Sequence, residues 1–225
     1  MKAQEKAKFV VLIGPTSVGK GFEVKLMLRT LAGLMAQGLK VSVISFGQII
    51  RDKMAHDRSF FKKFGHTVGK GSLLDNATAI ELFEEAYTLL CKDGTPDLVI
   101  IDGFCRSTEQ IRWASDNGFL RSSDLVYLLE ADMAVCVERF VHRNNHADAK
   151  RIDTEMETFY ARFHLHTNTI GDLRALLKET AHVVDIDANG NIPEIVHTTV
   201  MSALLPVICD IVRHKARHHQ PTAVH

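Results

Sequence analysis

The stretch Gly14-Pro15-Thr16-Ser17-Val18-Gly19-Lys20-Gly21 follows the apolar, β-branched run Lys8–Ile13 and precedes a segment with helical periodicity. Its spacing is Gly-x4-Gly-Lys. Glycines let the backbone curl so that successive N–H groups point inward, and the helix that follows adds its positive N-terminus. A strand, such a loop and a helix in this order are typical of a phosphate-binding site, in which Lys20 can reach the outer phosphates of a nucleotide.

Apolar runs like Lys8–Ile13 recur four more times, at residues 40–45, 97–102, 124–130 and 182–186. Near-continuous apolar runs of this length are typical of strands that are buried on both faces of a parallel sheet. The segments between them have helical periodicity, and the first of these helices is expected to end at Gly38. This alternation predicts an α/β, three-layer fold of the P-loop NTPase type around a five-stranded, mostly parallel sheet.

The composition argues against several classes of protein. The 225 residues include 27 Lys+Arg and 27 Asp+Glu, so a nucleic acid polymer is not expected as a partner. The 4 cysteines lie far apart in the sequence, which favours reduced thiols and a cytoplasmic location over a zinc or disulfide scaffold. The most apolar stretch, 195–212, is interrupted by His197, Pro206 and Asp210, so no membrane partner is expected.

Two polar stretches interrupt the strand–helix alternation, one after the second strand and one around residues 144–150. Both are expected above the strand ends, where α/β proteins bind ligands. We therefore expect a single domain over residues 1–211, with a helical insertion at about 46–75 and a short lid at about 143–151. Residues 212–225, rich in histidine, are expected to form a flexible tail, and the protein is expected to be a monomer.

Gly21 stands where the general phosphate-loop pattern has Ser or Thr. This Gly-Lys-Gly variant resembles the adenylate kinase and nucleoside monophosphate kinase family. Further segments are similar to family motifs, in the family's order, between about residues 9 and 204. They are Ser45-Phe46-Gly47-Gln48-Ile49-Ile50-Arg51, Gly71-Ser72-Leu73-Leu74, Asp102-Gly103-Phe104-Cys105-Arg106 with Gln110, Glu138-Arg139 with Arg143, and Arg151-Ile152-Asp153 with Arg162.

The resemblance implies an enzyme that moves the γ-phosphoryl group of Mg-ATP to a nucleoside monophosphate, with AMP favoured by Gln110. Such a transfer depends on positioning and charge neutralisation, and arginine suits phosphate oxygens. Asp102 would orient Mg²⁺ and its waters, with no metal bound directly by the protein. The residues implied as catalytic are Lys20, Asp102, Arg143, Arg151 and Arg162.

The resemblance also implies where each nucleotide binds. ATP is expected at the phosphate loop, with Arg139 stacked on the donor base; the loop residues are Gly14, Pro15, Thr16, Ser17, Val18, Gly19, Lys20, Gly21 and Phe22. The acceptor monophosphate is expected on Arg51 and Arg106, with its base near Gln110. The rest of the acceptor pocket is expected from Phe46, Leu73, Leu74 and Gly103.

Several positions depart from the family pattern and keep alternatives open. Phe22 removes a hydroxyl next to the phosphates, Phe46 replaces a small residue near the acceptor base, and the remaining departures are Gln48, Cys105 and Thr154. A P-loop kinase for another small metabolite and a nucleotide-binding sensor with weak catalysis are therefore alternative hypotheses. The histidines around the lid, at 142, 146, 164 and 166, are not expected to bind metal, because residues 144–150 contain no cysteine.

Overall fold

The computed structural model describes residues 7–145, 154–190 and 192–218. A single parallel sheet forms its centre, with the strand order β2-β3-β1-β4-β5. The strands are β1 (Lys8–Ile13), β2 (Val41–Ser45), β3 (Leu98–Asp102), β4 (Leu125–Glu130) and β5 (His182–Asp187). The central strand β1 pairs on both sides, so that Val10 lies opposite Ile100 of β3 and Leu125 of β4. The predicted five-stranded α/β fold is confirmed.

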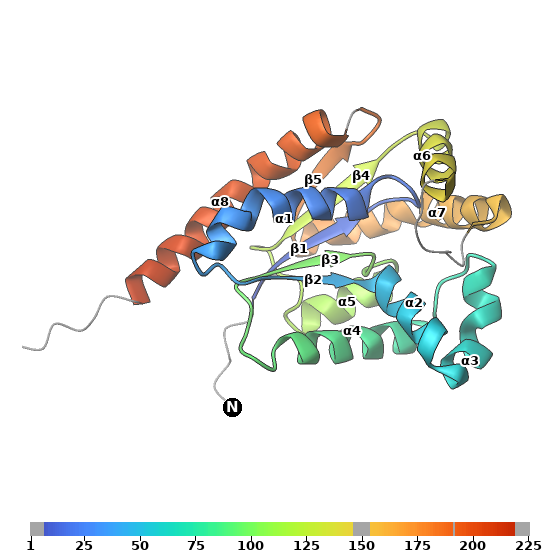
Figure 1. The fold of residues 1–225 in the computed structure, drawn as a ribbon, viewed down its shortest axis with the longest axis horizontal. Coiled ribbons are helices and arrows are strands. Elements are labelled where there is room, and N and C mark those ends of the chain that lie inside the picture. Colours follow the sequence, from blue (N-terminus) through green and yellow to red (C-terminus); the bar gives the residue numbers. More distant parts are fainter. Residues whose placement is uncertain (1–6, 146–153, 191, 219–225) are drawn as a thin grey trace, which may run out of the picture.

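Helices cover both faces of the sheet (Figure 1). One face carries α1 (Lys20–Ala36) and α8 (His197–His218), and the other carries α4 (Asn76–Leu90) and α5 (Thr108–Asp116). Side chains alternate along β1 between the two layers: Phe9 and Val11 belong to one core cluster, and Val10 and Leu12 to the other. All four are at most 1% exposed, which is why the strand reads as a continuous apolar run.

The insertion after β2 consists of two helices, α2 (Phe46–His56) and α3 (Arg58–Gly69). Asp57 separates them and caps α3, because its side chain accepts hydrogen bonds from the backbone N–H groups of Ser59 and Phe60. A turn after α3 leads into α4, which Asp75 caps through the N–H of Thr78. Because α2 follows the carboxyl end of β2 directly, the insertion lies beyond the carboxyl ends of the strands, on the side of the sheet where the phosphate loop follows β1 (Figure 1).

Helices α6 (Met133–Asn145) and α7 (Met156–Thr180) lie at the same edge of the sheet. The 25-residue α7 contributes to both core clusters: Phe159 and Phe163 pack with the α1/α8 layer, and Leu173 and Leu177 with the α4/α5 layer. It therefore crosses the edge of the sheet from one layer to the other. The predicted lid begins within α6, and its residues 146–151, with the neighbouring Ile152 and Asp153, lie outside the described residues.

The C-terminal helix corrects the expected boundary of the tail. A tail was predicted from residue 212, but the helix does not break there. Instead, α8 continues to His218, and Lys215 Nζ donates to Asp97 Oδ2 at 2.6 Å. Residues 219–225 lie outside the described residues. By length and composition alone, the segment Glu194–Arg217 is apolar enough to cross a membrane, with a hydropathy of 1.9, despite its polar interruptions. In the fold, 33% of the apolar window is buried, and Val200 and Leu204 on one face of α8 are fully buried in the core.

Candidate nucleotide-binding site

The phosphate loop connects β1 to α1 in a conformation that its glycines allow. Gly19 has φ 112°, which a residue with a side chain rarely adopts, and its carbonyl oxygen accepts from the N–H of Phe22 and of Glu23 as α1 begins. A Cβ atom on Gly14 would lie 2.5 Å from the carbonyl oxygen of Leu129, so no larger residue fits there. Ser17, at φ 60°, has a buried hydroxyl with no hydrogen-bond partner among the described residues. A buried loop hydroxyl without a protein partner is suited to a ligand oxygen.

Lys20 lies at the start of α1 with its side chain folded back over the loop. Its ammonium group donates to the carbonyl oxygens of Gly14 and Pro15, each at 2.8 Å, and the residue is 9% exposed. Burial lowers the pKa of Lys20 to about 8; Asp102 opposes this effect, and Arg106 and Arg143 add to it. Lys20 is therefore a buried cation whose charge a bound anion would stabilise.

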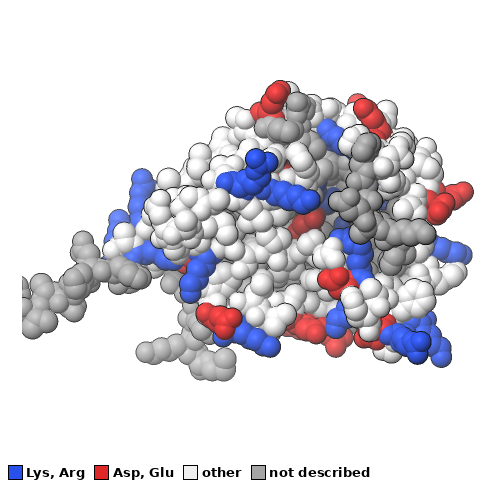
Figure 2. All heavy atoms as spheres, viewed as in Figure 1, with Lys and Arg blue, Asp and Glu red and all other residues white. Residues whose placement is uncertain are grey.

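A cavity of about 1060 Å³ opens at the carboxyl edge of the sheet, and both the phosphate loop and the insertion line it. This volume is at the upper end of small-molecule sites. Its lining includes one Asp and one Glu, Asp102 and Glu138, against a larger set of cationic side chains: Lys20, Lys25, Arg51, Arg106, Arg139, Arg143 and Arg162. Basic and acidic side chains are mixed over the face seen in Figure 2, whereas the charged side chains that line the cavity are mainly cationic. Such a cavity suits a polyanionic small molecule.

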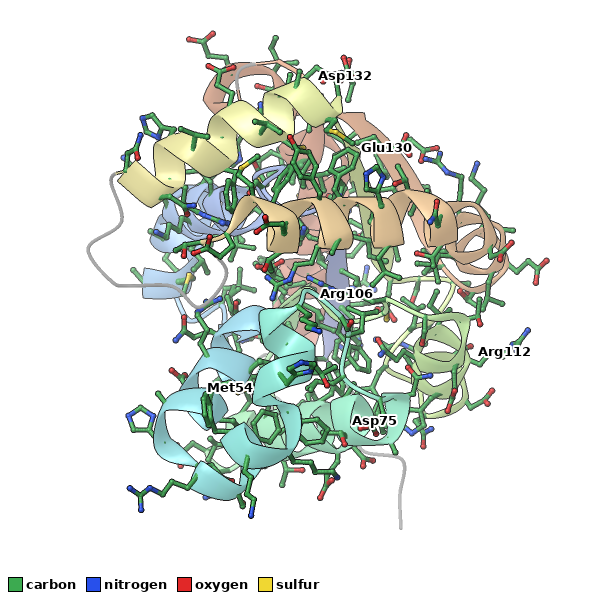
Figure 3. The ribbon with its side chains drawn as sticks, turned by 90° about the vertical axis from the view of Figure 1, so that its right-hand side faces the viewer. Met54, Asp75, Arg106, Arg112, Glu130 and Asp132 are labelled. Atoms are coloured by element: carbon green, nitrogen blue, oxygen red, sulfur yellow. The ribbon has the colours of Figure 1, made fainter. Side chains whose placement is uncertain are left out.

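Arg106 lies in the middle of this edge, between α7 and the two insertion helices (Figure 3). Its guanidinium group is open to the solvent of the cavity, but enough protein surrounds it to lower its pKa, an effect that Asp102 opposes and Arg162 increases. Gly103 has φ 89°, and a Cβ atom there would lie 3.1 Å from Arg106 Nη2, so this glycine leaves room for the guanidinium. The geometry presents Arg106 to a ligand.

Gln110, in the first turn of α5, is 4% exposed and is held in one orientation. Its Oε1 accepts from the backbone N–H of Arg106 at 2.9 Å, and its Nε2 donates to Oδ1 of Asn76 at 3.0 Å. Asn76 in turn donates from Nδ2 to the carboxylate of Glu109, an acceptor only, which fixes both amides. One Nε2 hydrogen and one Oε1 lone pair of Gln110 remain for a ligand in the cavity.

The other predicted acceptor residues also line the cavity. Arg51 lines the cavity, and its Nη2 donates to Gln48 Oε1 at 2.6 Å. Gln48, which departs from the family pattern, therefore positions this arginine. The Phe46 ring is 6% exposed and packs on Phe104 with ring centroids 5.5 Å apart, so it forms a wall of the cavity. Leu73 and Leu74 complete this side.

The predicted lid residues are only partly described. Arg139 lines the cavity and donates to the carbonyl oxygens of Val18 and Gly190, both at 2.9 Å, so it ties the phosphate loop to the turn after β5. Arg143 lies over the Phe140 ring at 5.1 Å, and Arg162 Nη2 donates to the carbonyl oxygen of Val68 at 3.2 Å. Arg151 lies outside the described residues.

His166 is a cavity residue that sequence reasoning does not identify. It lies in the middle of α7, and burial lowers its pKa to about 4, with Lys20 and Arg106 adding to the effect. His142 also lines the cavity, from α6. No group of three or more His, Cys, Asp or Glu residues in the described part of the chain could hold a metal ion.

A parallel α/β sheet whose phosphate loop opens into a cation-lined cavity defines a nucleotide-binding P-loop protein. Residues 13–159 match the model of a protein family described as "AAA domain", and the chain belongs to this family. Its resemblance to the adenylate kinase family is likewise confirmed by relatives that carry that name and match nearly end to end.

Three of these adenylate kinases illustrate the match. The chain is 25% identical to that of Salinibacter ruber over 83% of this chain and 93% of the relative. It is 27% identical to that of Deinococcus radiodurans, over 89% and 98%, and 28% identical to that of Mycobacterium leprae, over 83% and 93%. The class predicted from the sequence, an ATP-dependent nucleoside monophosphate kinase, is thereby confirmed.

Proposed function

We propose that the protein transfers the γ-phosphoryl group of Mg-ATP to AMP and forms two molecules of ADP. The observation that carries this proposal is that one cavity is shared by the phosphate loop and by the insertion α2–α3, so that a donor and an acceptor nucleotide can meet in it. Cations from both sides converge there, which supports a reaction between two phosphorylated substrates rather than the hydrolysis of one.

The donor polyphosphate binds across the N-terminus of α1. The backbone N–H groups of the loop and the helix dipole hold it, and Lys20 exchanges its carbonyl partners for phosphate oxygens. Arg139 ties the loop to the turn at Gly190, so it supports the donor site by holding its walls together. Stacking of Arg139 on the donor base is part of the same proposal.

The acceptor binds between the insertion and α5. Arg106 and Arg51 neutralise its monophosphate, while the fixed amide of Gln110 offers one donor and one acceptor to the edge of its base. Adenine presents a neighbouring donor and acceptor of this kind, which supports AMP. Phe46, Leu73, Leu74 and Gly103 shape the rest of this pocket.

Arginines from α6 and α7 surround the transferring group. Arg143 and Arg162 neutralise the charge that spreads over its oxygens, and we assign the same role to Arg151. With two nucleotides in the cavity these charges are needed, because like-charged phosphates at contact distance repel strongly where water is excluded.

The site also fits a magnesium ion held through the nucleotide. The carboxylate of Asp102 faces the cavity beside the loop, 3.8 Å from a Cβ placed on Gly21, and the hydroxyl of Ser17 has no partner among the described residues. Mg²⁺ prefers phosphate oxygens, waters and few carboxylates, so Asp102 and Ser17 would hold its waters. The ion would supply charge neutralisation at the transferring phosphates.

A nucleotide sensor with weak catalysis is the second candidate. Phe22, which is 48% exposed at the mouth of the loop, places a ring where a hydroxyl is expected, and this favours binding without efficient transfer. A kinase for another metabolite is the third candidate.

The protein should be incubated with Mg-ATP and each of AMP, GMP, CMP, UMP and dTMP in turn, and the diphosphates separated by chromatography. The main proposal predicts turnover that is fastest with AMP. A faster rate with another monophosphate would overturn the acceptor assignment, and no turnover with any of them would favour the other candidates.

A further inference from the structure

His166 lines the cavity that the phosphate loop and the insertion share. It lies on α7 one turn after Arg162, and α7 crosses the carboxyl edge of the sheet. Its imidazole lines the cavity and lies close enough to Lys20 and Arg106 for both cations to disfavour its charged form. His164, two residues earlier on the helix, is exposed and is not part of the cavity lining, as expected for positions on different faces.

The surroundings of His166 are dominated by positive charge. The charged and titratable groups that share its cavity come from α1, α2, the end of β3, the loop after it, α6 and α7. They are Lys20, Lys25, Arg51, Asp102, Arg106, Glu138, Arg139, His142, Arg143 and Arg162. In the absence of an anion, burial and then the charges of Lys20 and Arg106 lower the pKa of His166 to about 4, so the imidazole is neutral at physiological pH.

A bound polyphosphate offsets the charge of these cations and gives the buried imidazole an anionic partner. Lys20 at the donor loop and Arg106 at the acceptor side are the two cations that act on His166, and under the proposed function phosphates lie between them. A chain of five phosphates carries more negative charge than these two cations carry positive charge. An imidazolium is also a stronger donor to a phosphate oxygen than a neutral imidazole.

We propose that His166 is a phosphate-contacting residue of the transfer site, which takes up one proton when a polyphosphate bridges Lys20 and Arg106. This inference rests on the proposed two-nucleotide function and deepens it. Protonated His166 then adds a positive charge to the site only when both substrates are present. In the free cavity the neutral histidine adds no repulsion to the cations already there. The alternative is a histidine that stays neutral and only fills space in the wall of the cavity.

Calorimetric titration with a bisubstrate analogue, two adenosines joined by five phosphates, tests the proposal. The analogue has no terminal phosphate monoester, so its phosphates do not titrate near neutral pH. Titrations without Mg²⁺ at about pH 6.5, in buffers of different ionisation enthalpy, give the number of protons taken up on binding. Lys20 is protonated at that pH both free and bound, because its pKa of about 8 in the free protein lies above it and bound phosphate raises it further.

The wild type should take up close to one proton, and His166→Gln close to none. The matched variant His164→Gln, at an exposed position outside the cavity lining, should keep the wild-type value. The affinity of the wild type should increase by up to about tenfold for each unit of pH lowered towards 5.5, and that of His166→Gln should not. Nuclear magnetic resonance of the imidazole carbons in the wild type, free and bound, checks the same titration without a variant.

Two negative outcomes are distinguishable. If the analogue binds the wild type but His166→Gln takes up as many protons, or the His166 resonances show no protonation on binding, this inference is overturned and the proposed function stands. If the analogue does not bind the wild type at all, the two-nucleotide function fails and the role of His166 fails with it.

Discussion

The ammonium nitrogen of Lys20 lies 2.8 Å from the carbonyl oxygen of Gly14, at the opposite end of the same loop. The lysine thus closes its own phosphate loop while its positive charge is buried. Burial makes the charged form of Lys20 less favourable, and phosphate oxygens are better acceptors for a buried ammonium than neutral carbonyls are. Nucleotide binding is therefore favoured, because it gives the ammonium an anionic partner.

The first prediction concerns this lysine. Lys20→Met should lower kcat at least ~100-fold, because it removes a cation from the transition state, while the melting temperature changes little. Lys92→Met, at an exposed site after α4, should leave kcat unchanged. Near-wild-type turnover of Lys20→Met in a steady-state assay would contradict the assignment.

The second prediction is a pH dependence. Since burial lowers the pKa of Lys20 to about 8, the free enzyme loses this charge as the pH rises through that value. We expect kcat/KM for ATP to fall above about pH 8, up to tenfold per unit, and kcat to hold to a higher pH, because bound phosphate stabilises the ammonium. A kcat/KM profile that stays flat to pH 10 would mean that the charge of Lys20 is not needed.

Phe46 provides the third prediction. Phe46→Thr should change the ratio of kcat/KM values between monophosphates and leave the KM for ATP nearly unchanged, because the ring lines the acceptor side of the cavity. It should also lower the free energy of unfolding by about 3 kcal/mol, since the ring packs on Phe104. Phe46→Leu, which keeps much of the apolar volume, serves as the control for packing. An unchanged ranking of acceptors would place the base elsewhere.

The fourth prediction uses the bisubstrate analogue as a thermal probe. At a concentration of a hundred times its Kd it should stabilise the fold by about 2.7 kcal/mol, seen as a rise in melting temperature larger than that given by ATP. Arg143→Ala and Arg162→Ala should each reduce the rise. Arg29→Ala, on the exposed side of α1, should not. An analogue that stabilises no more than ATP would contradict the two-site geometry.

The fifth prediction lies outside the cavity. The carboxylate of Glu23 is fully buried beneath α8, and His197 Nδ1 contacts it at 2.7 Å while His197 Nε2 contacts Thr30 at 2.9 Å. His197→Ala leaves this buried carboxylate without its ring partner and should lower the free energy of unfolding by about 3 kcal/mol in denaturant titrations. Adding Glu23→Gln should recover part of the loss, because the remaining group is then neutral. A single variant as stable as the wild type would show that the pair contributes nothing.

The sequence predicted the sheet well because its strands are buried on both faces. Residues 40–45 were expected and Val41–Ser45 is the strand; residues 182–186 were expected and His182–Asp187 is the strand. Buried parallel strands leave a continuous apolar run that needs no tertiary information to recognise. The phosphate loop was also recognisable, because its backbone requires glycine at fixed places such as Gly14 and Gly19.

The remaining features depend on tertiary contacts that a local pattern does not encode. His166 was not assigned to the site, because α7 packs into both layers and its sequence does not indicate which face meets the cavity. Arg139 donates to the carbonyl oxygens of Val18 and Gly190, two contacts with residues distant in sequence that no local pattern predicts. The sequence predicts a tail where α8 ends, because the hydrogen bond between Lys215 and Asp97 joins residues 118 positions apart and leaves no local pattern.

The stoichiometry of the reaction tests the central proposal most directly. With limiting AMP and excess Mg-ATP, chromatography should show two ADP formed for each AMP consumed and no inorganic phosphate released. ADP alone should be converted back to ATP and AMP by the same protein. If instead AMP is not consumed, or ADP appears together with an equal amount of inorganic phosphate, the protein does not join two nucleotides in its cavity and the proposed phosphoryl transfer is wrong.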